Sequence, residues 1–147
     1  SRDAARLMAE TLAGMPIQRV FVVHGEPGWD EPTPCGPFEL YDVTPGHVVR
    51  TERDPLDCGL ARCTPQSLAG GDAARNAAGM RAVFTGQDRG SHRDALVLNA
   101  ALALEVTGTV ADPHEAIRAA SDALDRGDGA RLLEKLATFG RSIGGAP

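Results

Sequence analysis

The sequence has no excess of positive charge and no long apolar segment. It contains 15 Lys and Arg against 20 Asp and Glu, for a formal net charge of −5, and no basic stripe stands out. We therefore expect no nucleic-acid partner and no binding to anionic membranes. The longest apolar stretch, Ala95 to Leu104, is interrupted by Asn99 and is too short to cross a bilayer.

Cysteine is also scarce. The three cysteines are Cys35, Cys58 and Cys63, and all lie in stretches expected to be loops. Their odd number argues against a disulfide framework. A structural zinc site would need two further ligands, which neither His24 nor His47 supplies at a credible spacing. We expect free thiols and a cytoplasmic protein, because thiols stay reduced in that compartment.

Length and composition fit one domain with a buried core. The chain has 147 residues, of which 42% are hydrophobic. It starts with Ser1 rather than Met, and a helical pattern begins within three residues. We therefore expect residues 1–147 to be part of a longer protein.

The chain opens with a predicted helix and a predicted strand. Apolar residues recur at helical spacing over Asp3–Leu12, with Asp3 as a candidate N-cap, and Gly14 then ends the pattern. The apolar run Arg19–Val23 follows and is too short for a helix. A helix followed directly by a buried strand is typical of a parallel sheet, which we therefore expect here.

A hairpin is predicted further along. Phe38–Val43 alternates apolar and polar residues, and Val48–Glu52 is a second extended run. The segment between them, Thr44–His47, contains the Pro and Gly that are typical of a turn. We place this hairpin at a sheet edge, where prolines are tolerated.

The remainder is predicted to be mainly helical. We expect helices over Pro65–Leu68, Asp72 to about Thr85, Asp94–Thr107, Asp112 to about Gly127, and Asp128–Phe139, with a frayed tail from Ile143. The Asp94–Thr107 segment is apolar almost all round, so it should be a central buried helix. Asp72 is the expected cap of its helix, and His92 and Asp94 are expected to cap the central one.

Two adjacent carboxylates, Asp30 and Glu31, follow the first strand on a loop rich in Gly and Pro. In open α/β sheets, ligands gather at the carboxyl ends of strands. Mg²⁺ prefers a few carboxylates completed by water and substrate phosphates, and neighbours on an irregular loop can face one ion together. Acids on such loops are also often simply solvated, and their spacing alone favours that interpretation.

Other polar groups have structural interpretations that we prefer. Gly70–Asp72 resembles a phosphate loop, but its carboxylate would repel the anion. Ser91–Asp94 contains the residue types of a hydrolase triad, whose members are seldom sequence neighbours. Asn99 and His24 are expected to be satisfied by hydrogen bonds. The sequence contains neither a P-loop nor a dinucleotide-binding glycine fingerprint.

Several short motifs occur together in a fixed order. They are Val22–Gly25, Gly28–Glu31, Cys58–Leu60, Gly70–Asp72 with Asn76–Ala77, and Arg93–Ala101, followed by alanine-rich helices. In this order and spacing the set resembles the C-terminal part of the anthranilate phosphoribosyltransferase family, over about Asp3–Arg141. Each motif alone is weak, whereas the ordered set is specific.

The resemblance implies an α/β fold with a partial sheet flanked by helices. Residues 1–147 would be the C-terminal portion of the nucleoside phosphorylase/phosphoribosyltransferase-type catalytic domain, without the N-terminal helical domain and the phosphate-binding loop. The parent, expected to be a homodimer, would transfer phosphoribose from 5-phosphoribosyl-1-diphosphate to anthranilate in tryptophan biosynthesis, with Mg²⁺. The isolated chain is expected to be inactive.

The resemblance also gives Asp30 and Glu31 a role. They match the family's Asp-Glu pair, which holds magnesium near the diphosphate. That role fits the chemistry, because displacement of diphosphate needs charge neutralised on the leaving group. No side chain of this segment is needed as a nucleophile.

Two positions depart from the family pattern. Trp29 stands where a smaller aliphatic residue is usual, and Cys58 where Phe is usual. A different acceptor therefore stays open. The alternatives are a related phosphoribosyltransferase or pyrimidine nucleoside phosphorylase, and a non-catalytic binding module of the same fold. The sequence before Ser1 would discriminate between the enzymes, because acceptor-binding residues lie there in the family.

Overall fold

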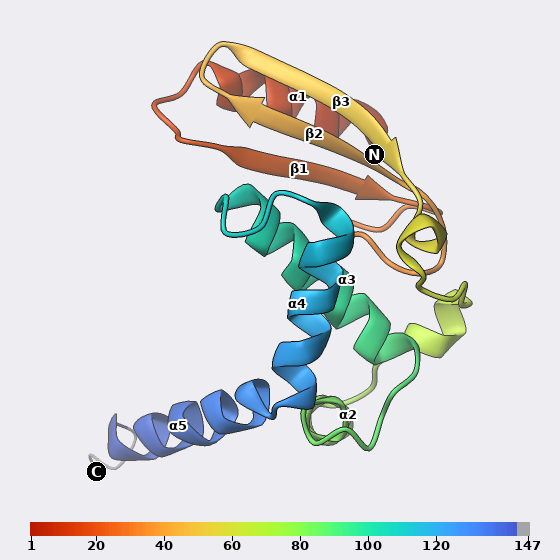
Figure 1. Cartoon of the computed structure of the whole chain (residues 1–147), viewed down its shortest axis with the longest axis vertical. Coiled ribbons are helices and arrows are strands. Elements are labelled where there is room, and N and C mark those ends of the chain that lie inside the picture. Colours follow the sequence, from red (N-terminus) through yellow and green to blue (C-terminus); the bar gives the residue numbers. More distant parts are fainter. Residues whose placement is uncertain (144–147) are drawn as a thin grey trace.

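The structure, a computed structural model, describes residues 1–143 and places a small sheet between helices (Figure 1). Its elements in chain order are α1 (Arg2–Ala13), β1 (Val20–Gly25), β2 (Phe38–Thr44), β3 (His47–Arg53), the 3-10 helices η1 (Pro55–Cys58) and η2 (Pro65–Leu68), α2 (Ala73–Phe84), α3 (Ser91–Val106), α4 (Pro113–Asp125) and α5 (Asp128–Ile143). Helix α1 covers one face of the sheet, and α3, packed on α4, lies on the other. The tail expected to fray lies, beyond Ile143, outside the described residues.

The sheet is antiparallel, in the order β1-β2-β3, so the expectation of a parallel sheet is wrong. In the β1–β2 register, Val22 lies opposite Tyr41 and Val23 lies opposite Leu40. Successive strand residues point to opposite faces. Both faces of β1 are covered by helices, which produces the continuous apolar run that usually marks a parallel strand.

This alternation feeds two separate hydrophobic clusters. The cluster on the α1 side contains Ala5, Ala9, Val22, Tyr41 and Val43. The cluster on the α3 side is larger and is built mainly by α3 and α4 against the sheet; its buried members are Phe38, Leu40, Leu60, Val97, Leu98, Ala101, Leu102, Ala116, Ile117 and Ala120. The sheet is therefore the middle layer of a helix–sheet–helix arrangement.

The predicted hairpin is confirmed, with boundaries one residue longer at each inner end. Strands β2 and β3 meet at Thr44 and His47. Gly46 has φ +76° in the turn, a left-handed conformation that glycine adopts without steric cost. Strand β3 is the mostly exposed edge, whereas β2 is central.

Most predicted helix starts are also confirmed. The Asp72 side chain accepts a hydrogen bond of 2.8 Å from the Arg75 amide, and Asp112 accepts one of 2.9 Å from the Glu115 amide. These bonds satisfy amides that have no partner within the helix.

No described helix has the length and apolar character needed to cross a membrane.

The caps predicted for two helices, Asp3 for the first and His92 and Asp94 for the central one, are wrong. Helix α1 is capped by Ser1, whose hydroxyl accepts from the Ala4 amide at 3.3 Å, because the helix begins one residue before Asp3. Helix α3 begins at Ser91 with Gly90 at the cap and no side-chain cap bond. Instead of capping, the His92 Nδ1 atom lies 3.1 Å from Asp88 Oδ2.

A buried carboxylate holds α1 against the hairpin. Glu39 on β2 is buried, yet Oε1 accepts from Arg2 at 3.1 Å and from Arg50 at 2.5 Å, and Oε2 accepts from the Tyr41 hydroxyl at 3.0 Å. The hydrogen bond from Arg50 is the main cause that lowers the pKa of Glu39 below its ordinary 4.5, against the opposing effect of burial.

We expect this cluster to make stability fall in acid. A carboxyl whose folded pKa is lowered stabilises the fold above its ordinary pKa, and the gain is lost as the pH drops through the lower folded value. Replacing Glu39 with Gln should cost about 1–3 kcal/mol at pH 7. It should also flatten the decline of the thermal midpoint between about pH 5 and pH 3. Circular dichroism melts across this range measure both effects.

Glu134→Gln is the matched control, because it removes an exposed carboxylate from α5, which lies apart from the Glu39 cluster. This variant should follow the wild-type pH profile. If Glu39→Gln declined in parallel with the wild type, Glu39 would not be the source of the acid sensitivity.

Candidate functional site

The loop between β1 and β2 carries the predicted site and is closed at its base by the strand ladder. Gly25 lies opposite Phe38 at the end of the β1–β2 pairing. Beyond that pair, the Glu26 amide donates to the Pro37 carbonyl at 3.0 Å. The two ends of the loop are therefore fixed side by side.

A tight inner turn follows. The amides of Gly28 and Trp29 both donate to the Gly25 carbonyl at 2.8 Å, and the Gly25 amide donates to the Trp29 carbonyl at 3.0 Å. A Cβ on Gly25 would lie 2.5 Å from the Glu31 carbonyl oxygen, so only glycine fits this close approach. Gly28, with φ +135°, also adopts a backbone conformation that L side chains rarely take. The turn thus brings the backbone of Glu31 back against Gly25.

The second half of the loop is held from the other side. Pro32, Thr33 and Pro34 are buried. Asn99 on α3 donates from Nδ2 to the Pro32 carbonyl at 3.0 Å and to the Ala95 carbonyl at 2.9 Å. The expectation that Asn99 is satisfied by hydrogen bonds is confirmed. Its bond to Pro32 also shows that α3 holds the loop in place, which the sequence did not indicate.

Asp30 and Glu31 lie between these two anchored parts. Both side chains are exposed, and neither takes part in a salt bridge within residues 1–143. Their oxygens are the hard ligands that Mg²⁺ prefers. No group of three or more His, Cys, Asp or Glu comes together as metal ligands in the described part. The pair could therefore supply only part of a coordination shell.

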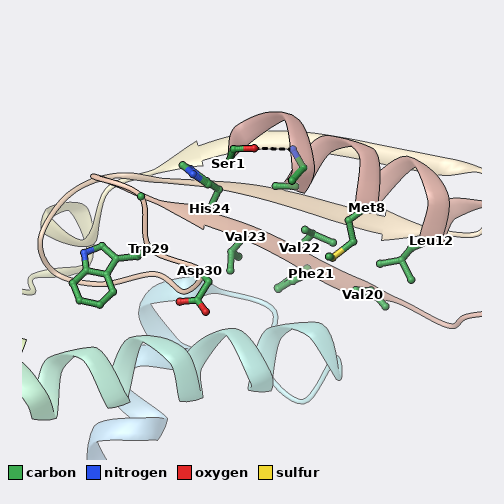
Figure 2. A pocket seen from close by; sticks show the side chains of 13 residues that line it. Ser1, Met8, Leu12, Val20, Phe21, Val22, Val23, His24, Trp29 and Asp30 are labelled. Atoms are coloured by element: carbon green, nitrogen blue, oxygen red, sulfur yellow. Dashed lines mark hydrogen bonds between the residues drawn. The ribbon is translucent and has the colours of Figure 1, made fainter. Parts of the chain in front are cut away.

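Asp30 also lines a cavity along the outer side of β1. The cavity measures about 380 Å³ and is bounded by apolar residues of α1 and β1, with His24, Trp29 and Asp30 at the loop end (Figure 2). The Nδ1 atom of His24 is buried without a hydrogen-bond partner in the described structure, so the expectation that His24 is satisfied is wrong. The sequence carries no signal for this, because the burial of one ring nitrogen depends on tertiary packing.

The structural interpretation of the Gly70–Asp72 motif is confirmed, whereas the capping role predicted for His92 and Asp94 is wrong. Asn76 accepts from the Gly71 amide at 2.8 Å and donates to the Gly71 carbonyl at 3.0 Å, which closes the glycine turn before α2. In the triad-like motif, His92 Nδ1 lies 3.1 Å from Asp88 Oδ2, and within residues 1–143 no hydrogen bond joins His92 to Ser91 or Asp94. Neither group forms a catalytic arrangement.

The fold and the loop match a known class of protein. The chain belongs to the glycosyl transferase family, whose a/b domain matches residues 1–130. Within that family, the chain is similar to anthranilate phosphoribosyltransferases, as its motifs predicted. It is 41% identical to the enzyme of Rubrobacter xylanophilus over 99% of this chain and 42% of that protein. It is 39% identical to the enzyme of Desulforudis audaxviator over 92% of this chain and 39% of that protein.

Solved structures agree with the sequence comparisons. The anthranilate phosphoribosyltransferase of Thermus thermophilus superimposes with a TM-score of 0.83 at 32% identity, covering 96% of this chain and 41% of that one. The enzyme of Saccharomyces cerevisiae, in a structure with PRPP and Mg, shares the fold with a TM-score of 0.80 at 23% identity, covering 91% of this chain and 39% of that one. The chain therefore spans about two fifths of the length of these relatives.

The close approach at Gly25 makes a testable prediction. Gly25→Ala should force the Glu31 backbone away and destabilise the chain by about 1–3 kcal/mol, the usual cost of overpacking. Urea unfolding followed by circular dichroism measures the change.

Gly79→Ala is the matched control. Gly79 lies inside α2, and a Cβ there meets nothing within 4 Å. It should stabilise the chain by about 0.5–1 kcal/mol through helix propensity. An equal effect of the two substitutions would show that Gly25 is not sterically constrained.

Proposed function

We propose that this chain is part of an anthranilate phosphoribosyltransferase and that Asp30 and Glu31 are its magnesium ligands. The observation that carries the proposal is the exposed carboxylate pair at the carboxyl end of β1, on a loop fixed at both ends. Identities of 39–41% to curated anthranilate phosphoribosyltransferases support the transferase role. A yeast relative with PRPP and Mg bound supports the choice of ion.

In the proposed reaction, the protein has mainly to position the substrates and to neutralise the charge of the diphosphate. Bound magnesium would neutralise the diphosphate as it leaves the anomeric carbon. Asp30 and Glu31 would hold the ion in place, since they are presented by a loop whose backbone is hydrogen-bonded to β1 and α3. Water and the diphosphate oxygens would complete the shell, as is usual for Mg²⁺. Transfer to the amine of anthranilate would complete this step of tryptophan biosynthesis.

The free edge of β1 supports the proposed place of this chain in a larger domain. Within the described residues β2 is the only strand that pairs with β1, although the side chains of β1 are apolar on both faces. An apolar strand with an open edge is normally covered or paired. We propose that residues 1–147 form the C-terminal portion of the catalytic α/β domain and that further strands of the parent continue the sheet beyond β1. The phosphate loop, anthranilate contacts, dimer interface and cytoplasmic setting would belong to that parent, so the chain alone should not catalyse the transfer.

The metal assignment is tested in the longer protein. Asp30→Asn with Glu31→Gln removes both charges with little change in shape. We expect a turnover at least about 100-fold lower, because the charge of the leaving group is no longer neutralised, and a higher magnesium concentration at half-maximal rate. Initial rates of phosphoribosyl transfer, measured across a magnesium titration, give both values.

A second pair of exposed acids serves as the control. Asp122→Asn with Glu134→Gln, on α4 and α5, removes the same charge from helices remote from the loop. It should leave the magnesium titration unchanged. An unaltered magnesium requirement in the Asp30–Glu31 variant would refute the metal role, and absence of any anthranilate transfer by the longer wild-type protein would refute the proposed reaction.

A further inference from the structure

Two of the three cysteines meet in the fold, although they lie 28 positions apart in the sequence. The Sγ atoms of Cys35 and Cys63 are 3.5 Å apart, and both residues are half-buried. Cys35 lies near the end of the loop that carries Asp30 and Glu31, and Cys63 lies between η1 and η2. Cys58, which is closer to Cys63 in the sequence, is not part of this contact.

The backbone holds the two thiols at this distance. The Cys63 amide donates to the Pro34 carbonyl at 3.2 Å, next to Cys35 in the chain. The Cys35 amide donates to the buried Thr33 hydroxyl at 3.3 Å. A disulfide requires sulfur atoms about 2.05 Å apart, so the thiols need to approach by about 1.5 Å, a movement within reach of side-chain rotation.

We propose that Cys35 and Cys63 form a reversible redox pair that closes to an intramolecular disulfide. The oxidant is a small-molecule disulfide of the glutathione class. One cysteine, as thiolate, attacks that disulfide and releases one thiol. The second cysteine thiolate then attacks the mixed disulfide, which forms the Cys35–Cys63 bond and releases the second thiol. Two protein thiols are oxidised and one external disulfide is reduced, and two protons are lost to solvent or to the leaving thiolates.

The burial of Cys63 lowers the reactivity of its thiol. Burial is the main cause that raises the pKa of the Cys63 thiol above its ordinary 9.0. Because the thiolate is the reactive form, oxidation should be slow at neutral pH and faster as the pH rises.

The bond would tie the metal loop to the segment after η1. Asn99 already fixes Pro32, and the disulfide would add a covalent link three residues further on. This consequence for the site depends on the proposed magnesium role of Asp30 and Glu31, whereas formation of the disulfide does not.

The test uses the 147-residue chain itself. It is equilibrated in glutathione buffers of graded redox potential, its free thiols are alkylated, and its tryptic peptides are mapped without reduction. Trypsin separates Cys58 from Cys63 by cleaving after Arg62. We expect the peptide of residues 63–75 linked to that of residues 20–50, with Cys58 alkylated and the link reversed by dithiothreitol. The oxidised chain should melt about 5–10 °C higher.

Two single variants give the controls. Cys58→Ser should keep both the link and the rise in melting temperature, and Cys63→Ser should lose both. Pairing that includes Cys58, dimers linked between chains, or three alkylated cysteines at every potential would overturn the proposal. Oxidation in urea separates the effect of the fold from that of sequence proximity. The proposal is supported if the Cys35–Cys63 disulfide dominates in the folded chain but not in urea. It is contradicted if the same mixture of disulfides forms with and without urea.

Discussion

The antiparallel pairing of β1 with β2 is the interaction on which the rest of this structure depends. Its register sends alternate residues of both strands into two clusters, so one ladder joins the layer of α1 to the layer of α3 and α4. The same ladder fixes the base of the loop that presents Asp30 and Glu31, through Gly25 opposite Phe38 and the bond from Glu26 to Pro37. The fold and the candidate site therefore both depend on the β1–β2 pairing, and a shift of its register by one residue would disrupt both.

Local chemistry explains which parts of the fold were predictable from the sequence. The hairpin turn and the Asp72 cap depend on residues a few positions apart, and both are confirmed. The direction of β1 depends on which strand pairs with it, and its apolar run is equally compatible with a parallel neighbour, so that prediction is wrong. The predicted start of α3 is also wrong, although the contact involved is local: the His92 side chain lies beside Asp88, four positions earlier, and does not cap the helix.

The residues of the candidate site could be proposed from the sequence, whereas the geometry of their loop could not. Asp30 and Glu31 could be named because they follow a buried strand and match an ordered set of motifs. Their loop is held by Asn99 from 67 positions away and closed at Gly25 by a contact with Glu31. The contact of Cys35 with Cys63 is likewise a product of tertiary structure, as is the burial of His24 Nδ1 without a partner among residues 1–143. A periodic pattern carries no information on such contacts, since they depend on where distant segments meet.

The central claim is that an anchored loop presents Asp30 and Glu31 as one arm of a magnesium site. The most direct measurement is the ¹H–¹⁵N NMR spectrum of this chain titrated with Mn²⁺, a paramagnetic substitute for Mg²⁺, in the presence of inorganic diphosphate. The account predicts line broadening centred on the amides of Trp29, Asp30 and Glu31, and its loss when both acids are replaced by their amides. Broadening centred on other acidic residues, or unchanged in that variant, would contradict it.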